Sequence, residues 1–337
     1  MLTQPQDPLG RDLPLSHSVE LPVLGLWVRF ETSHPAVLAA VVDSFGPLPE
    51  GGVLPACGSR VAARVQVFVQ DGEEGAGGHA PIRYRSPNPQ RLLVTTPASL
   101  GVAELDRKEA YAYVSQSLLA DARHFQFGML ETLTLVLVAG TNRQPVHAAL
   151  LAEQGVGLLL IGNSGSGKSS LTYAAARSGI CALGEDVAYV QREPEFRIWA
   201  APRRIHLLPE AASFFPELAG RPTTRLPSGK NKIVVGLDRT RACGMNPVAK
   251  VGVCLLEKGT GLPRVQEARP TEVEQVLNGQ LEPGFDFFRE GAPNVGRLVS
   301  NRALRCWRLC VSPDPRESVP LLGGLLADLA ALVAPTS

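Results

Sequence analysis

The sequence predicts an α/β protein with a mixed sheet, preceded by a smaller N-terminal α+β region. Three observations lead to this fold class. An apolar run at 157–161 is followed by a glycine-rich turn and then by a helical stretch at 169–178. Segments of strand length alternate with helical patterns through the rest of the chain. A content of 45% apolar and 19% charged residues can bury a sizeable core in 337 residues, so disorder of the whole chain is excluded.

The sequence of the first 123 residues indicates a flexible tail followed by a small α+β region. Residues 1–18 are polar and contain prolines, which is typical of a loose tail. Ser33-His34-Pro35 has the form of a helix start, with a capping position ahead of an early proline. The elements expected over 19–123 are a strand at 21–30, a helix at 36–42, a strand at 61–70, and short strands at 82–85 and 91–94.

The larger domain is expected over 124–337. Its boundary is expected near 124–143, where an apolar stretch at 129–138 is typical of a buried helix. The strands expected after it lie at 147–153, 157–161, 181–184, 187–190, 196–200, 232–235, 250–256 and 304–311. The helices expected there lie at 169–178, 270–281, 294–300 and 321–332.

The glycine-rich turn fits the phosphate-binding P-loop pattern G-x-x-x-x-G-K-S. Glycines allow backbone N–H groups to turn inward around a polyphosphate, and the N-terminus of the following helix adds partial positive charge. A lysine reaches the outer phosphates, and a serine hydroxyl completes a magnesium shell. We therefore expect a nucleotide's phosphates to be held by Gly162, Asn163, Ser164, Gly165, Ser166, Gly167, Lys168, Ser169 and Ser170.

An acidic pair and a histidine flank this loop in the sequence. Glu185 and Asp186 stand seventeen and eighteen residues after Lys168, at the end of a strand that we expect beside the P-loop strand. Adjacent carboxylates there could divide the work, one holding a metal and one accepting a proton, although a solvated acidic turn is the alternative. His147 stands fifteen residues before Gly162, and a lone histidine on a strand is more often packed than catalytic.

Basic residues beyond the acidic pair are further candidates for contact with phosphate. Lys230 and Lys232 lie in a Ser-Gly-Lys-Asn-Lys turn that could close over a nucleotide, and alternation would put both on one side of a strand. Arg203 and Arg204 are a second pair, of which we expect one to face solvent. An ordinary solvated loop is the alternative for both pairs.

The stretch from His147 to Val190 resembles the catalytic core of the HPr kinase/phosphorylase family and its wider kinase relatives. It also looks like the nucleotide domain of phosphoenolpyruvate carboxykinase. The resemblance implies a P-loop domain with a mixed sheet, ATP and Mg²⁺ as cofactors, and phosphoryl transfer to a serine-type hydroxyl. By the same resemblance, Lys168 contacts the outer phosphates, Ser169 and Asp186 hold the metal, Glu185 is the base, and His147 lies near the transferred phosphate.

The sequence also departs from that family. The signature of a glutamate followed by Arg-Gly-Leu-Gly-Ile is absent, and the acidic pair is Glu-Asp rather than Asp-Asp. The acceptor is therefore open among a protein, a peptide and a small molecule. A non-catalytic ATP-binding regulatory module and a carboxykinase-like enzyme remain the alternative functions. The resemblance leaves a homo-oligomer open, and we expect 19–123 to select an acceptor or a partner.

Composition argues against several other classes. The chain has 33 basic and 32 acidic side chains and no long basic stripe, so nucleic acid is not an expected partner. Its six cysteines form no C-x-x-C pair, which gives little support to zinc or to a disulfide framework. The N-terminus lacks the pattern of a signal peptide, and no stretch has the length of a membrane span. We therefore expect a reduced, cytoplasmic protein with no membrane partner.

Overall fold

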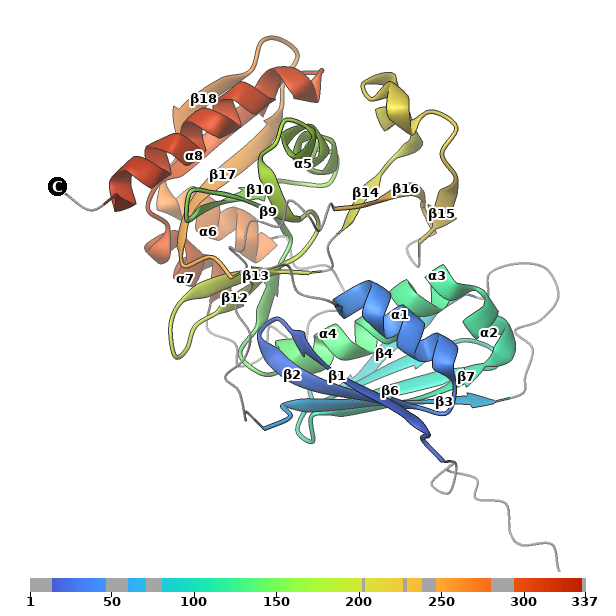
Figure 1. Ribbon diagram of the computed structural model, residues 1–337. Coiled ribbons are helices and arrows are strands. Elements are labelled where there is room, and N and C mark those ends of the chain that lie inside the picture. The colour runs from blue at the N-terminus through green and yellow to red at the C-terminus, as the bar shows by residue number, and fades with distance from the viewer. Residues whose placement is uncertain are drawn as a thin grey trace, which may run out of the picture. The chain divides into compact units, whose positions relative to one another are not determined.

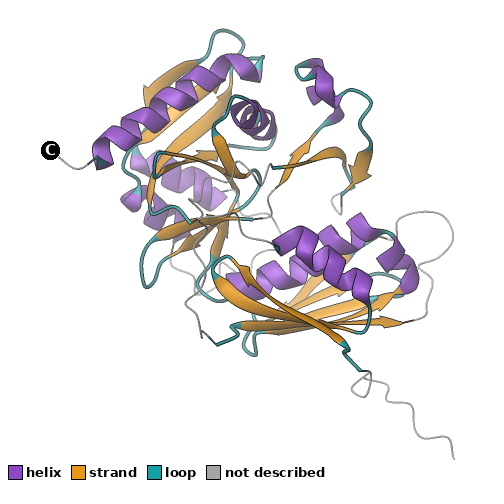
Figure 2. Ribbon diagram, in the orientation of Figure 1, coloured by secondary structure: helices purple, strands orange, loops and turns teal. Residues whose placement is uncertain are grey.

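The computed structural model describes residues 14–46, 60–70, 81–201, 204–226, 229–237, 247–279 and 294–334. The chain divides by its contacts into an N-terminal unit that ends at Val138 and a C-terminal unit that begins at Ala139. Each unit has its own sheets and helices (Figures 1 and 2). The division falls within the boundary region expected at 124–143, and it follows Met129 and Leu133 because these residues lie against Gly101 of the N-terminal sheet.

The N-terminal unit is built on a seven-stranded sheet in the order β1-β2-β3-β7-β6-β5-β4. Neighbours β2, β3 and β7 run parallel, and the remaining neighbours are antiparallel. The strands are β1 (His17–Val23), β2 (Leu26–Thr32), β3 (Ala63–Gln70), β4 (Arg83–Asn88), β5 (Arg91–Thr95), β6 (Leu100–Glu104) and β7 (Glu109–Ser115). The expected strands at 61–70, 82–85 and 91–94 are present, whereas β6 and β7 were not predicted.

The strand expected at 21–30 is a hairpin of two strands. The chain reverses at Leu24 and Gly25, whose φ angles are +48° and +75°. Both residues of this tight turn have left-handed backbone, and a leucine there gives no sequence signal for a turn. The first strand also begins at His17, inside the expected tail, while residues 1–13 lie outside the described ranges.

Helices cover one face of the N-terminal sheet (Figure 1). They are α1 (Pro35–Phe45), α2 (Gln116–Ala120), α3 (Ala122–Phe125), the π-helical segment η1 (Gln126–Leu130) and α4 (Glu131–Ala139). The expected start of α1 is confirmed, because His34 caps the helix by accepting a hydrogen bond from the N–H of Ala36 and Pro35 takes the first helical position.

The C-terminal unit contains a six-stranded mixed sheet in the order β11-β9-β10-β17-β19-β18. Its strands are β9 (Ala148–Glu153), β10 (Val156–Ile161), β11 (Cys181–Gly184), β17 (Lys250–Lys258), β18 (Arg264–Glu267) and β19 (Cys306–Val311). Two three-stranded sheets accompany it, formed by β8 (Gln144–Val146), β12 (Ala188–Gln191) and β13 (Arg197–Ala200), and by β14 (Arg204–Leu207), β15 (Thr223–Arg225) and β16 (Asn231–Gly236). The chain is therefore a mixed α/β protein, as predicted.

Helices lie on both faces of the six-stranded sheet (Figure 1). The main ones are α5 (Lys168–Arg177), α6 (Pro270–Gly279), α7 (Val295–Arg302) and α8 (Val319–Val333), with 3₁₀ segments η2 (Pro209–Ser213), η3 (Pro216–Leu218) and η5 (Pro315–Ser318). Strand β10 is buried on both sides: Leu158 and Leu160 join the core of α5 and α8, and Leu159 and Ile161 join that of α6 and α7. Each buried leucine contributes about 1.5–3 kcal/mol, so β10 is a firm base for the loop that follows it.

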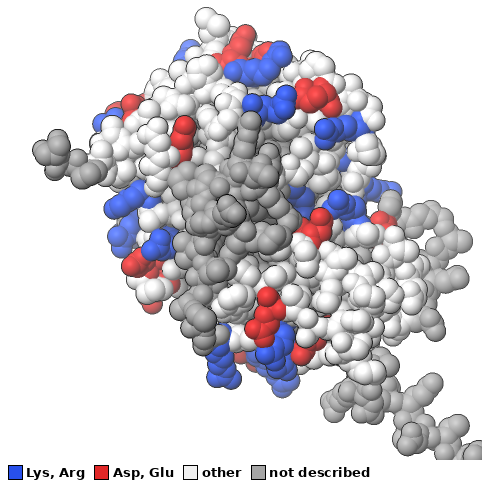
Figure 3. All heavy atoms as spheres, viewed as in Figure 1, with Lys and Arg blue, Asp and Glu red and all other residues white. Residues whose placement is uncertain are grey.

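Two further expectations concern the cysteines and the surface. Among the described cysteines, Cys254, Cys306 and Cys310 are free, whereas Cys181 is disulfide-bonded, which corrects the expectation of a reduced chain. None of the helices in the described ranges combines the length and apolar character that a membrane span requires. On the face in Figure 3, basic and acidic side chains are interspersed rather than gathered by sign.

Candidate functional site

The glycine-rich loop connects the end of β10 to the start of α5, as the sequence predicted. Gly165 and Gly167 have φ angles of +85° and +88°, a backbone conformation that other residues adopt only with strain. Gly167 is the N-cap of α5 and no side chain caps that helix. The first N–H groups of α5 therefore have no capping side-chain acceptor, which is the arrangement that binds anions at helix N-termini.

Close packing fixes the start and the interior of the loop. A Cβ atom at Gly162 would lie 2.7 Å from the Ser166 Oγ and 2.9 Å from the backbone oxygen of Leu256, so only glycine fits there. Ser166 and Lys168 are 8% and 7% exposed. The Ser166 Oγ is buried and has no hydrogen-bond partner among the described residues. A buried hydroxyl beside a bend of backbone N–H groups fits an anionic oxygen, so these residues suit a phosphate group.

The register of three strands brings the loop and the acidic pair to one edge of the sheet. β9 runs antiparallel to β10, with Ala148 opposite Ile161. β11 runs antiparallel to β9, with Gly184 opposite Leu150. The start of β9 and the ends of β10 and β11 therefore lie together. The expectation that β11 lies directly beside β10 is wrong, because β9 separates them.

Glu185 follows β11 and contacts the start of α5. Its Oε1 accepts a hydrogen bond from the Ser169 hydroxyl. Its Oε2 accepts one from the backbone N–H of His206 at 3.1 Å and lies 3.5 Å from the His206 Nδ1. The carboxylate is only 2% exposed, so both oxygens are held inside the protein. Ser169, Glu185 and His206 thus form one buried polar cluster beside the loop.

Asp186 lies in a different environment from Glu185. Its side chain is 54% exposed, and its Oδ1 is 3.3 Å from the Nδ1 of His147. His147 stands between β8 and β9 and is half-buried. The loop, the acidic pair and His147 are therefore linked by contacts through Ser169 and Asp186. The same residues were predicted to share one site, with Ser169 and Asp186 as its metal ligands. In the structure, Ser169 instead contacts Glu185.

The basic candidates are placed differently from one another. Arg204 is buried on β14, on the same side of the strand as His206, while Ile205 and Leu207 between and after them pack into the core. Lys230 is exposed just before β16, and Lys232 lies on that strand. Within the described ranges, no hydrogen bond or ion pair joins either lysine to the loop. Arg203 lies outside the described ranges.

His206 was not assigned a role from the sequence, although it occurs in the Arg-Arg-Ile-His stretch. The strand that carries it, β14, is only four residues long and was not predicted, because its polar side chains, Arg204 and His206, resemble those of a surface segment. The alternation of these polar residues with apolar ones could have revealed the strand. A period of two places Arg204 and His206 on the face opposite two buried apolar residues, which is typical of a strand beside a polar site.

Hydrogen bonding controls the ionisation of Glu185. Burial acts to raise the pKa of this carboxyl, but the hydrogen bonds from His206 and Ser169 and the nearby imidazole outweigh it and leave the pKa below its ordinary value. Ionised Glu185 is thus the form that the folded protein favours, which suits a group that faces cations and hydroxyl donors.

This lowered pKa predicts a pH dependence of stability. A carboxyl with a depressed folded-state pKa stabilises the fold above its unfolded pKa of about 4.3, and that contribution is lost as the pH falls through the folded-state pKa. We expect the unfolding free energy of Glu185→Gln to fall less steeply with decreasing pH than that of the native protein, between about pH 5 and 3. Urea unfolding at a series of pH values measures this, and equal slopes would contradict it.

Comparisons with known proteins complete the description of the site. No protein-family model matches the chain, and a search of curated proteins finds no match either. Among solved structures, the chain is similar to the HPr(Ser) kinase/phosphatase from Coxiella burnetii, with 14% identity, a TM-score of 0.28, and coverage of 56% of this chain and 97% of that one. A likeness this loose carries no argument. The class of the protein is therefore defined by its own residues: a mixed α/β protein with a glycine-rich strand–loop–helix unit and a carboxylate pair beside it.

Proposed function

We propose that the chain is an ATP- and Mg²⁺-dependent kinase that transfers the γ-phosphoryl group to a serine-type hydroxyl of a protein, peptide or small molecule. One observation carries the proposal. The strand register places the glycine-rich loop, Glu185, Asp186 and His147 at a single edge of the sheet. A phosphate cradle with two carboxylates and an imidazole beside it has the parts that phosphoryl transfer needs.

The loop binds the donor. The backbone N–H groups around Gly165 and Gly167 hold phosphate oxygens, and Lys168 supplies a positive charge at the outer phosphates. Ser166 contributes a buried hydroxyl to the same oxygens. Arg204 is the further candidate for charge stabilisation from β14, and Lys230 and Lys232 are candidates for closure over the nucleotide.

The contacts favour a division of roles between the two carboxylates that is the reverse of the one the resemblance implied. Glu185 shares a hydrogen bond with Ser169, and a P-loop serine is a metal ligand, so we assign Ser169 and Glu185 to magnesium. When bound, this ion neutralises charge on the phosphates. Among the described residues no group of three or more metal-binding side chains occurs, which fits an ion held largely by phosphate oxygens and water.

Asp186 is then the base. It is half-exposed, so an acceptor can approach it from solvent, and His147 at 3.3 Å holds its orientation. Asp186 accepts the hydroxyl proton as the hydroxyl oxygen attacks the γ-phosphorus. The bond between that phosphorus and the bridging oxygen breaks, and ADP leaves with the bond's electron pair.

Transfer of label from [γ-³²P]ATP to proteins and small molecules of a cell extract tests the proposal. We expect Asp186→Asn to bind ATP like the native protein but to transfer label about 10²- to 10⁴-fold more slowly, the usual contribution of a positioned base. Asp328→Asn is the matched control, since Asp328 is exposed on α8 and should transfer at the native rate.

Three results would redirect the proposal. ATP binding without any transfer would favour a non-catalytic regulatory module. Label in an enol phosphate formed with release of CO₂, rather than in an acid-stable ester, would favour a carboxykinase-like enzyme. Native transfer by Asp186→Asn would reject Asp186 as the base.

A further inference from the structure

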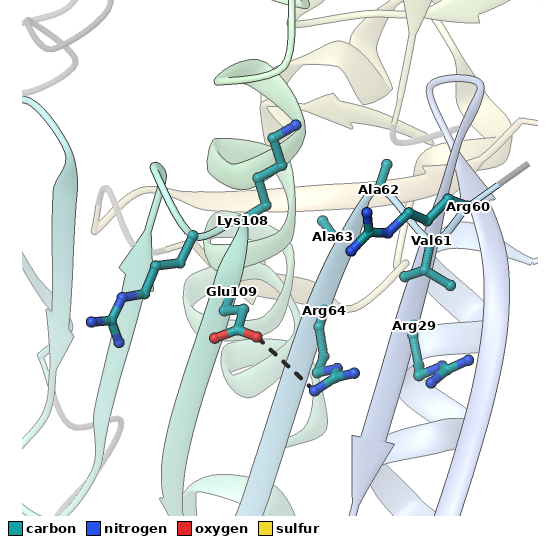
Figure 4. A pocket seen from close by; sticks show the side chains of 9 residues that line it. Arg29, Arg60, Val61, Ala62, Ala63, Arg64, Lys108 and Glu109 are labelled. Atoms are coloured by element: carbon teal, nitrogen blue, oxygen red, sulfur yellow. Dashed lines mark ion pairs between the residues drawn. The ribbon is translucent and has the colours of Figure 1, made fainter.

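The N-terminal unit contains a cavity of about 730 Å³ at one edge of its sheet. The cavity lies where β3 and β7 begin, beside β2, and Figure 4 shows its side chains projecting from these neighbouring strands. Its charged lining is formed by Arg29, Arg60, Arg64, Arg107, Lys108 and Glu109. Five cations thus surround a hollow with a single carboxylate in its wall.

Backbone hydrogen bonds hold the chain segments of this cavity together. The N–H of Ala62 donates to the backbone oxygen of Trp27 at 2.7 Å, which fixes the segment before β3 against β2. The N–H of Arg64 donates to the backbone oxygen of Lys108 at 2.9 Å, which fixes the turn before β7 against β3. The cationic side chains therefore rise from anchored backbone, an arrangement that lowers the entropic cost of binding a ligand.

Two of the five cations in the cavity, Arg29 and Arg64, form ion pairs within the protein. Arg29 binds Glu20 at 2.6 Å, and Arg64 lies 3.5 Å from Glu31 and 4.0 Å from Glu109, the latter ion pair being drawn in Figure 4.

Three cations in this wall have no such partner. Among the described residues, Arg60, Arg107 and Lys108 make no ion pair, and the carboxylate of Asp106 accepts a hydrogen bond from the backbone N–H of Arg107. All three side chains are exposed. They are free to contact an anion that enters the hollow.

The turn that carries two of these cations is strained. Lys108 has a φ angle of +57°, a conformation uncommon for any residue with a side chain. Glycine or asparagine would occupy this position at a lower cost. The N–H of Lys108 donates to the backbone oxygen of Leu105 at 3.3 Å, so this conformation belongs to a closed hairpin turn that fixes where both cations stand.

We propose that this cavity binds a small polyanion, a molecule that carries two or more phosphate or carboxylate groups. The volume of about 730 Å³ lies in the range of small-molecule sites, whereas a protein partner would need a broader surface. Guanidinium groups bind both kinds of oxyanion through paired hydrogen bonds, and three cations can serve two separate anionic groups. This site is distinct from the glycine-rich loop and does not depend on the kinase proposal.

Equilibrium binding of inorganic tripolyphosphate and of citrate to the full chain tests the site. We expect the double variant Arg107→Gln/Lys108→Gln to bind at least about tenfold more weakly than the native protein. Arg85→Gln is the matched control, because Arg85 is an exposed arginine on β4 of the same unit outside the cavity. Lys168→Ala reads the glycine-rich loop separately, because any tripolyphosphate held there loses a cation while the cavity keeps all of its own.

Each outcome decides the proposal. Loss in the double variant that Arg85→Gln does not share supports it, and the preferred probe then identifies phosphate or carboxylate as the ligand's group. Filling the hollow by Ala62→Leu should weaken the same binding without removing a charge, so it separates a shaped site from general attraction. No binding of either probe, equal loss in Arg85→Gln, or loss only in Lys168→Ala would overturn the proposal, whatever the outcome of the phosphoryl-transfer assay.

Discussion

Replacing Lys168 with alanine is expected to weaken ATP binding more than tenfold and to slow any turnover of ATP by about 10²- to 10³-fold, the usual cost of removing one charge-stabilising group. Lys168 is 7% exposed at the first position of α5, directly after the left-handed Gly167. Its ammonium group is thus confined beside the loop rather than free in solvent. Titration with a fluorescent ATP analogue and measurement of ADP release provide the two readouts.

The control for Lys168→Ala is Lys250→Ala. Lys250 is exposed at the start of β17, opposite Val156, and therefore lies at the end of the sheet away from the loop. Alanine is a strong helix former, so α5 should persist in Lys168→Ala and both variants should unfold near the native temperature. If folded Lys168→Ala binds ATP with native affinity, the proposal that the glycine-rich loop binds the phosphates of ATP is wrong.

The second large effect is expected for Gly162→Ala. The added Cβ would meet the backbone oxygen of Leu256 at 2.9 Å and the Ser166 Oγ at 2.7 Å. The serine hydroxyl can rotate away, but the carbonyl belongs to a buried strand and cannot move without shifting β17. We expect a loss of about 1–3 kcal/mol in unfolding free energy, as for other overpacked sites, together with weaker ATP binding.

Urea unfolding and the same ATP titration measure both effects of Gly162→Ala. Gly261→Ala is the matched control, because a Cβ at Gly261 would meet no atom within 4 Å and its backbone is not left-handed. It should change neither quantity. If Gly162→Ala has native stability and native ATP affinity, the loop accommodates a Cβ atom at this position, and the prediction is wrong.

Local sequence was sufficient to predict an element where the side-chain pattern and a steric rule indicated the same structure. The P-loop strand and helix were predicted because a fully apolar run, a glycine-rich turn and a helix follow directly along the chain. The cap of α1 was predicted because a capping position ahead of an early proline is typical of a helix start. The hairpin at Leu24 and Gly25 was missed because its turn rests on a leucine in a conformation that leucine seldom adopts.

The partners within the site could not be predicted in the same way. Glu185 and Asp186 are neighbours in sequence, yet one is buried against Ser169 and His206 and the other is half-exposed beside His147. The two residues stand in a bend between β11 and β12, where the alternation of a strand no longer fixes which way each side chain points. Which residue meets which partner depends on β9 lying between β10 and β11, and no local signal specifies that order.

The sequence by itself determined the mixed α/β class, the strand–loop–helix unit, and the set of residues that could serve a phosphate site. These follow from the side-chain period and from backbone sterics, both of which act over a few residues. Only the tertiary structure decided that His206 joins Glu185, that Ser169 faces Glu185 rather than Asp186, and that the cations of the N-terminal unit line one cavity. Those contacts join residues far apart in the chain, and they depend on strand order and register, which are set by burial of the whole core.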